Sequence, residues 1–264
     1  MGTAKQFGDV AVDVHDDYVA VAEIGRPPDN YFDAGLIGSL ADAYEWAEAE
    51  AGARVVVLCS AGKHFCAGAD FTGRSGGARP AGSANYAGDL YAQAARLFRA
   101  RLPVVAAVQG AAVGGGLGLA CSADFRVASP AARFSANFAR LGLHQGFGLS
   151  VTLPAIIGQQ HANLMLYTGR RVPGQEAARL GLADLLADPA ELRDTAHGLA
   201  AEIAAAAPLA VRSIRSTQRA GLAERVSEAM AAELAEQDQL RRTADFAEGV
   251  RASAERRPPR FEGR

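Results

Sequence analysis

Two short, wholly apolar runs constrain the fold of this chain more than any other feature. Residues 55–58 (VVVL) and 103–108 (PVVAAV) are too short for helices and lack the alternation of a half-exposed strand. Such runs are typical of strands buried on both faces of a parallel sheet. Another strand is expected over 125–128, and helical patterns cover 33–51 and 85–101. The order strand, helix, strand, helix, strand predicts an α/β fold with right-handed crossovers.

The two ends of the chain differ in pattern. Near the start, alternation over 10–14, a turn at Asp16-Asp17 and a second run over 18–24 predict an antiparallel strand pair. From about residue 149 the pattern is helical throughout, with the last three helices expected over 201–219, 222–235 and 244–254. We therefore expect a core domain over 1–200 and a C-terminal helical region over 201–264. Such a region either covers the core or packs on a partner subunit. Residues 73–84 are expected to form a flexible insert.

Composition excludes several classes of function. The 27 basic and 29 acidic residues of the 264-residue chain give a net charge of −2, whereas a nucleic-acid-binding protein needs a clear basic excess. No apolar run approaches the roughly 20 residues of a membrane span. The three cysteines form no CxxC pair, so neither a disulfide framework nor a metal site is indicated. We expect a cytoplasmic protein with no bound metal.

Two glycine-bearing loops follow the buried strands, where backbone donors are no longer needed by the sheet. In the first, over 62–71, the small residues Ala67, Gly68 and Ala69 allow a ligand to approach the backbone closely. In the second, Gly114-Gly115-Gly116 opens a helix, where free N–H groups and the helix dipole favour negative charge. The second loop lacks the Lys-Ser/Thr of a P-loop and the spacing of a dinucleotide fingerprint. Both loops could bind a developing oxyanion, although tight turns and close helix packing explain the same glycines.

The order of the motifs resembles the enoyl-CoA hydratase/isomerase (crotonase) superfamily over nearly the whole chain. Five segments carry this resemblance: RPPDN, FCAGADF, PVVAAVQGAAVGGGLGLACSADFRVAS, the loop that begins at Phe134, and YTGRRVPGQEAARLGLAD. The resemblance implies a spiral of ββα repeats with a C-terminal helical trimerisation region, often assembled as a dimer of trimers. It also implies that the substrate is an acyl-CoA or enoyl-CoA thioester, with coenzyme A as part of the substrate and no separate cofactor.

The resemblance also assigns roles to individual residues. The backbone N–H groups of Ala69 and Gly115 would hold the thioester oxygen as it becomes an enolate. Residues expected to line the substrate site or to contact coenzyme A are Arg26, Lys63, His64, Ala67, Gly68, Asp70, Gly114 and Phe138. Arg26 and Lys63 would pair with phosphates, and His64 would support the loop or touch coenzyme A. Asp70 matches a family acid that is usually structural.

The sequence departs from the family where a hydratase carries its two glutamates. Those positions hold Gly118 and Phe138, and a further acid of some isomerases corresponds to Gly146. Without a carboxylate, no base activates water at the β-carbon. His144 lies in the same loop and is a candidate replacement because histidine titrates near neutrality, or it makes only structural hydrogen bonds.

Three interpretations remain open. The favoured one is a crotonase-type enzyme with an altered base that acts on a CoA thioester through an enolate. The second is a non-catalytic acyl-CoA-binding pseudoenzyme in lipid metabolism. The third is a hydrolysis or decarboxylation assisted by the oxyanion hole alone.

Overall fold

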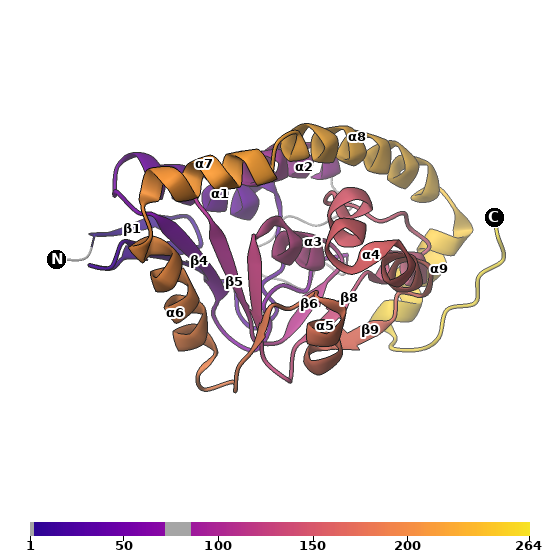
Figure 1. Cartoon of the computed structure of the whole chain (residues 1–264). Coiled ribbons are helices and arrows are strands. Elements are labelled where there is room, and N and C mark those ends of the chain that lie inside the picture. The colour runs from indigo at the N-terminus through magenta and orange to yellow at the C-terminus, as the bar shows by residue number, and fades with distance from the viewer. Residues whose placement is uncertain (1–2, 72–85) are drawn as a thin grey trace.

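A seven-stranded sheet forms the centre of the computed structural model, which describes residues 3–71 and 86–264 (Figure 1). The strands, in spatial order, are β1 (Thr3–Phe7), β2 (Val10–Val14), β3 (Val19–Ile24), β4 (Val55–Ser60), β5 (Val104–Val108), β7 (Phe125–Ala128) and β10 (Leu185–Leu186). Strands β1, β2 and β3 pair antiparallel, and every later pairing is parallel. The predicted opening pair and the predicted buried strands are confirmed. The insert predicted over 73–84 falls within 72–85, outside the described residues.

A second, three-stranded sheet was not predicted. It consists of β6 (Ala111–Val113), β8 (Arg133–Ser135) and β9 (Arg171–Pro173), with β6 and β8 parallel and β8 and β9 antiparallel. Together with β10, strand β9 shows that the expectation of continuous helix after residue 149 was wrong. Strands of two or three residues are too short to produce a readable alternation.

The helices connect these strands and cover them. They are α1 (Ala34–Ala49), α2 (Tyr86–Arg99), α3 (Gly115–Ser122), α4 (Leu149–Thr168), α5 (Gly174–Leu180), α6 (Leu192–Ala205), α7 (Pro208–Gln218), α8 (Leu222–Leu240) and α9 (Ala244–Ala254), with a 3₁₀ turn η1 over Asn137–Leu141. As expected, Asp33 caps α1 by accepting a hydrogen bond from the Leu36 N–H at 2.9 Å. No helix in the described part of the chain has both the length and the apolar character needed to cross a bilayer.

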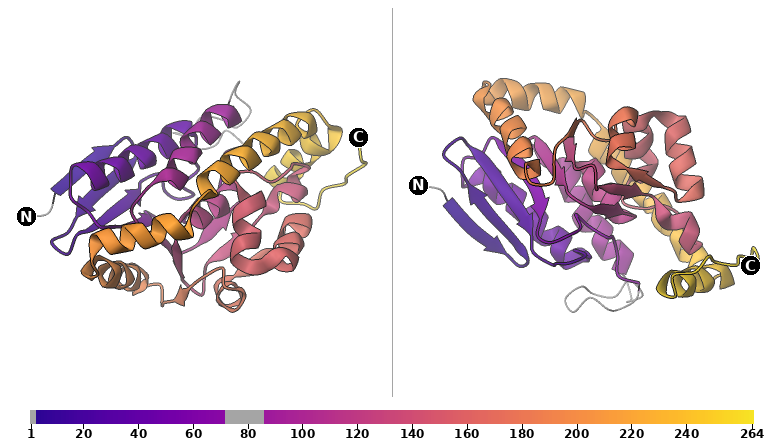
Figure 2. Two further views of the ribbon diagram at one scale, coloured as in Figure 1. Left: turned by 45° about the horizontal axis from the view of Figure 1, so that its top comes forward. Right: turned by 90° about the horizontal axis from the view of Figure 1, so that it is seen from below.

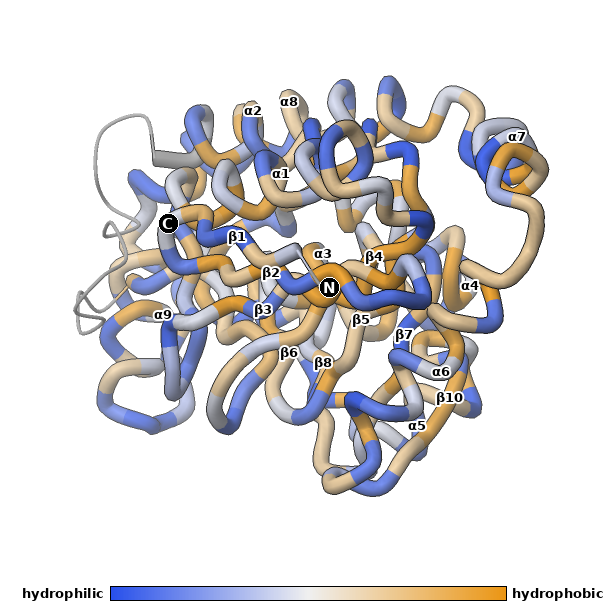
Figure 3. The backbone as a smooth tube through the Cα atoms, turned by 90° about the vertical axis from the view of Figure 1, so that its left-hand side faces the viewer, coloured by the Kyte–Doolittle hydropathy of each residue, from blue (hydrophilic) through white to orange (hydrophobic). Residues whose placement is uncertain are grey.

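The central strands are buried on both faces, which explains their unbroken apolar sequence. Val55 and Val57 of β4 pack in one cluster with residues of α6, whereas Val56 and Leu58 belong to the larger core that includes α1 and α2. Hydrophobic colour accordingly gathers on the inner strands, while the outer helices alternate between polar and apolar positions (Figure 3). Parallel sheets require this coverage on both sides.

The C-terminal helices differ from the predicted pattern. The single helix expected over 201–219 was wrong: α6 ends at Ala205 and α7 begins at Pro208. Proline lacks the N–H that an interior helical position donates, so it is unfavourable within a helix but suits a first helical position. Ala200 and Ala204 of α6 are buried against the sheet, so this helix packs with the core on both sides of residue 200. Helices α7 and α8 run end to end along one side of the molecule (Figures 1 and 2), and α8 packs on α2.

Candidate functional site

The loop after β4 is held against the backbone of β6. The Cys66 N–H donates to Ala111 O at 2.9 Å, and the Val113 N–H donates to Cys66 O at 3.0 Å. Gly68 has a φ of +87°, and a Cβ on it would lie 2.7 Å from the Val113 carbonyl oxygen. A side chain at this position is therefore excluded both by the backbone angle and by the contact.

The start of α3 lies directly beside this loop. The Gly114 N–H donates to Ser135 O at 2.8 Å, so the next donor along the chain is that of Gly115. A Cβ on Gly115 would lie 2.3 Å from Cζ of Phe32, and a Cβ on Gly68 would lie 3.6 Å from the Gly115 nitrogen. The two glycine-bearing loops, far apart in sequence, are thus in direct contact.

Two backbone donors are left over at this junction. Among the described residues, no group accepts a hydrogen bond from the N–H of Ala69 or of Gly115. The second of these lies at the N-terminus of α3, where the helix dipole is positive. Both residues line one cavity of about 260 Å³. The arrangement can stabilise negative charge on an oxygen atom that lies in this cavity.

The rest of the cavity is mainly apolar and aromatic. Phe32 and Phe147 lie with ring centroids 5.4 Å apart, and Phe138 and Leu143 complete the same wall. Phe147 has a left-handed φ of 61°, a conformation that non-glycine residues rarely adopt. An apolar pocket with a few convergent polar groups is the usual form of a small-molecule site.

At Gly118, Phe138 and Gly146, where the resemblance places acids in other family members, side chains of this chain fill the space. A Cβ on Gly118 would lie 2.7 Å from Cβ of Phe147, and one on Gly146 would lie 2.0 Å from the Tyr91 hydroxyl oxygen. Phe138 itself lines the cavity. A carboxylate side chain at 118 or 146 would require these neighbours to move. Of the described residues that line the cavity, Asp70 alone carries a carboxylate, and it is almost fully buried.

Tyr91 is the hydroxyl in this part of the cavity. Burial raises the pKa of this hydroxyl well above the usual value of 10, although the nearby Phe147 N–H and Gln237 side chain partly oppose the shift. The hydroxyl is therefore neutral at physiological pH. It can donate a proton or a hydrogen bond but cannot act as a base there.

Some of the residues expected at the site lie outside the cavity. The Arg26 guanidinium is paired with Asp9 at 2.6 Å and with Asp33 at 3.1 Å. His64 accepts a hydrogen bond from the Ala111 N–H through Nδ1 at 3.2 Å. It therefore supports the loop, which is one of the two roles considered for it.

The other two are Lys63 and His144. Lys63 is exposed, and neither residue is among the described residues that line the cavity. His144 Nδ1 lies 2.9 Å from Gln145 O.

One wall of the cavity was not predicted from the sequence. Gln237 and Arg241 at the end of α8, together with Val250 and Ser253 of α9, also line the cavity. The sequence of α8 predicts that its polar residues face solvent, so nothing in it indicates that some of them line a cavity. The C-terminal helices therefore cover the core of their own chain, which was one of the two alternatives for this region.

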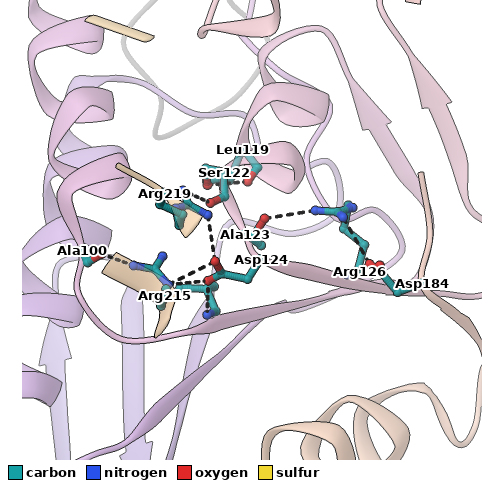
Figure 4. Close-up of polar contacts among 10 residues, drawn as sticks. Ala100, Leu119, Ser122, Ala123, Asp124, Arg126, Asp184, Arg215 and Arg219 are labelled. Atoms are coloured by element: carbon teal, nitrogen blue, oxygen red, sulfur yellow. Dashed lines mark hydrogen bonds and ion pairs between the residues drawn. The ribbon is translucent and has the colours of Figure 1, made fainter. Parts of the chain in front are cut away.

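A buried ion-pair cluster attaches the C-terminal helices to the core (Figure 4). Asp124 accepts hydrogen bonds from Arg215 of α7 at 2.9 Å and from Arg219 at 2.9 Å, and from the Val104 N–H at 2.8 Å. Arg219 also donates to Ser122 O at 3.1 Å. The side chains of Asp124, Arg215 and Arg219 are each less than a sixth exposed. Because α8 begins at Leu222, this cluster fixes the position of the helix that carries Gln237 and Arg241.

Comparison with known proteins agrees with this geometry. The family model described as enoyl-CoA hydratase/isomerase matches residues 15–264. The chain belongs to the enoyl-CoA hydratase/isomerase family. It is 33% identical over 246 residues to a carnitinyl-CoA dehydratase from Proteus mirabilis, covering 91% of this chain and 94% of that protein.

Solved structures of the family support the same fold. The crystal structure of an enoyl-CoA hydratase/isomerase from Pseudoalteromonas atlantica superposes with a TM-score of 0.83 at 29% identity, covering 96% of this chain and all of that one. An enoyl-CoA hydratase from Bacillus anthracis matches with a TM-score of 0.74 at 30% identity, over 97% of this chain and all of that one. The predicted α/β crotonase fold is therefore confirmed.

Proposed function

We propose that this protein binds an acyl-CoA or enoyl-CoA thioester and stabilises its enolate between the backbone N–H groups of Ala69 and Gly115. The observation that carries the proposal is a pair of donors that line one mainly apolar cavity and have no partner among the described residues. As the thioester oxygen gains negative charge, each donor is worth about 3 kcal/mol at the transition state. Ala67, Gly68 and Gly114 shape the loops that hold these donors, and coenzyme A enters as part of the substrate.

The acid/base groups of the proposed reaction differ from those of a standard hydratase. Addition of water to an enoyl-CoA needs a base near the β-carbon. Asp70 is the one carboxylate among the described cavity residues, and it already has an interaction partner. We therefore propose a lyase or isomerase reaction through an enolate, with a non-standard acid/base. In this proposal Arg26 and His64 position the loops, and His144 has no catalytic role.

A panel of thioesters tests this proposal. Crotonyl-CoA and longer enoyl-CoAs are incubated with the protein, and loss of the conjugated thioester absorbance is followed. Turnover of at least one thioester is the expected result. Tight binding without turnover across the panel would instead favour an acyl-CoA-binding pseudoenzyme, a second candidate supported by the close packing of Phe147 at Gly118. Absence of binding would contradict both.

We also propose that the chain assembles as a homotrimer or a dimer of trimers. Helix α7 has no buried residue, and its Leu209 and Ile214 side chains are 80% and 62% exposed. Exposed apolar residues gathered on one element are typical of an interaction surface. Light scattering after gel filtration measures the mass, and a monomer would contradict this assembly.

A further inference from the structure

The side of the cavity farthest in sequence from the glycine loops is cationic. Arg241, at the C-terminal end of α8, lines the cavity beside Gln237 and Tyr91. Its side chain is 23% exposed, so most of the guanidinium stem is removed from water. An alkyl acyl chain offers no hydrogen-bond acceptor to an arginine, so burial of a guanidinium beside such a chain would be unfavourable.

Hydrogen bonds hold this guanidinium in one orientation. Arg241 Nη2 donates to Gln237 Oε1 at 3.1 Å, and Nη1 donates to Asp238 Oδ1 at 3.2 Å. Gln237 is in turn fixed because its Nε2 donates to the carbonyl oxygens of His144 and Gln145, at 3.1 and 3.2 Å. Gln237 is 3% exposed, so this support is part of the folded core.

One donor of this guanidinium is left without a partner. Arg241 Nε is buried and makes no hydrogen bond within the described structure. A buried, unsatisfied donor costs about 1–3 kcal/mol. A ligand oxygen that accepted this hydrogen bond would recover that cost on binding.

The charges around Arg241 leave room for an anion. Asp238 is 55% exposed, and an ion pair with so exposed a partner is weak. Glu233 is buried nearby, but its carboxylate accepts hydrogen bonds from the Gly148 and Ser150 N–H groups at the start of α4. Asp70, the one acid among the described cavity residues, follows Ala69 in the loop after β4. A carboxylate matches the planar, forked donors of arginine in both charge and geometry.

We propose that the preferred substrate is a CoA thioester whose acyl chain ends in a second carboxylate, and that Arg241 is the residue that selects it. The inference rests on the proposed function, because it assumes that the thioester end lies between Ala69 and Gly115. Gln237 and Asp238 are positioning residues that orient the guanidinium. Tyr91 places its neutral hydroxyl at the same end of the cavity.

Affinity measurements on the full chain test this inference. Dissociation constants are compared for three pairs of equal chain length: succinyl- and butyryl-CoA, glutaryl- and pentanoyl-CoA, and adipyl- and hexanoyl-CoA. At the chain length that reaches Arg241, we expect the dicarboxylic thioester to bind about tenfold more tightly, which corresponds to ~1.4 kcal/mol. A hydroxyl-terminated thioester, 5-hydroxypentanoyl-CoA, is expected to show no such preference.

Variants assign the preference to one side chain. Arg241→Gln should abolish the preference for the dicarboxylic thioester, whereas Arg242→Gln, at an exposed neighbour, should retain it. Arg241→Lys keeps the charge and should retain part of the preference. It also serves as the folded comparison if Arg241→Gln is unstable.

Three outcomes would overturn the inference. A wild-type protein that binds every neutral thioester as tightly as its dicarboxylic partner has no selecting arginine. A preference that survives Arg241→Gln, or one shown equally by the hydroxyl-terminated thioester, would exclude the carboxylate contact. These results leave the proposed function standing, whereas failure of all the thioesters to bind would overturn the proposed function as well.

Discussion

The two walls of the cavity are built by different means. The wall formed by the loop at 66–70 and the start of α3 offers backbone N–H groups, and apart from Asp70 its side chains are small or absent. The wall from α8 and α9 offers the side chains of Gln237, Arg241 and Ser253. Backbone donors are fixed by the fold and cannot be removed by truncation, whereas side chains can be exchanged freely. We infer that the first wall defines the common chemistry and the second defines the substrate.

The largest effect is expected from adding a methyl group to the backbone wall. In Gly115→Ala the new Cβ would lie 2.3 Å from Phe32 Cζ, so the ring or the N–H must move. Loss of one oxyanion donor typically lowers turnover by about 100-fold or more. Turnover of the best thioester in the panel provides the measurement. Gly198→Ala, where a Cβ meets nothing within 4 Å, is the matched control. Equal turnover in the two variants would contradict the role given to Gly115.

The next effect concerns the attachment of the side-chain wall to the core. Asp124→Ala leaves the Arg215 and Arg219 guanidinium groups mostly buried and without their carboxylate. We expect the free energy of unfolding to fall by about 3 kcal/mol, since removing one partner of a buried pair leaves a charge uncompensated. Denaturant titration measures this change. Asp42→Ala breaks the more exposed pair with Arg96 and should cost less than ~1 kcal/mol. Similar losses in both variants would show that the cluster does not anchor α7.

A smaller effect is expected where the two walls meet. Tyr91→Phe removes a buried hydroxyl whose neighbours include the Phe147 N–H and the Gln237 side chain. The loss should be about 1–2 kcal/mol of stability, while Tyr167→Phe, at a side chain 75% exposed, should change little.

The stability lost in Tyr91→Phe should depend on pH in a defined direction. Because burial raises the Tyr91 pKa above 10, the contribution of its neutral hydroxyl is full below about pH 10 and is lost only as the pH rises further. Thermal or denaturant unfolding at several pH values checks this. A Tyr91→Phe penalty that already disappears between about pH 7 and 9 would contradict the neutral, buried hydroxyl.

The least change is expected at the cysteines. Burial raises the thiol pKa to about 12 for Cys66, beside the backbone wall, and to about 11 for Cys59 and Cys121. Because the thiolate is the reactive form, an aromatic disulfide reagent at about pH 8 should leave all three unmodified in the native protein. All three should react after unfolding. Rapid modification of Cys66 in the native state would mean that this wall opens readily.

The contrast between the walls also explains what the sequence could predict. Local rules predict the backbone wall only in part: a buried strand ends, small residues or glycines follow, and a helix begins, so free donors are expected within 67–69 and 114–116. The family resemblance then singles out Ala69 and Gly115. The side-chain wall depends on contacts across more than 90 residues, such as that between Gln237 and His144 O. Nothing in the local pattern of α8 distinguishes Arg241, which lines the cavity, from the exposed Arg242 beside it.

The same distinction between local and long-range causes applies to other features that the sequence did or did not predict. Asp33 and Pro208 act through local geometry, so the start of α1 was predictable and the break before α7 was readable from the proline. The placement of Phe147 depends on its left-handed backbone and on packing against Gly118 and Phe32. A residue rarely found in that conformation could not be assigned it from sequence.

Polarisation of the substrate carbonyl tests the central claim most directly. An acyl-CoA labelled with ¹³C at the thioester carbon is bound to the protein, and its carbonyl stretch is recorded by isotope-edited infrared difference spectroscopy. Two hydrogen bonds from Ala69 and Gly115 weaken the C=O bond, so we predict a band below that of the free thioester. The shift should be reduced in Gly115→Ala and retained in Gly198→Ala. A bound carbonyl that absorbs at the frequency of the free thioester would contradict the proposed oxyanion site.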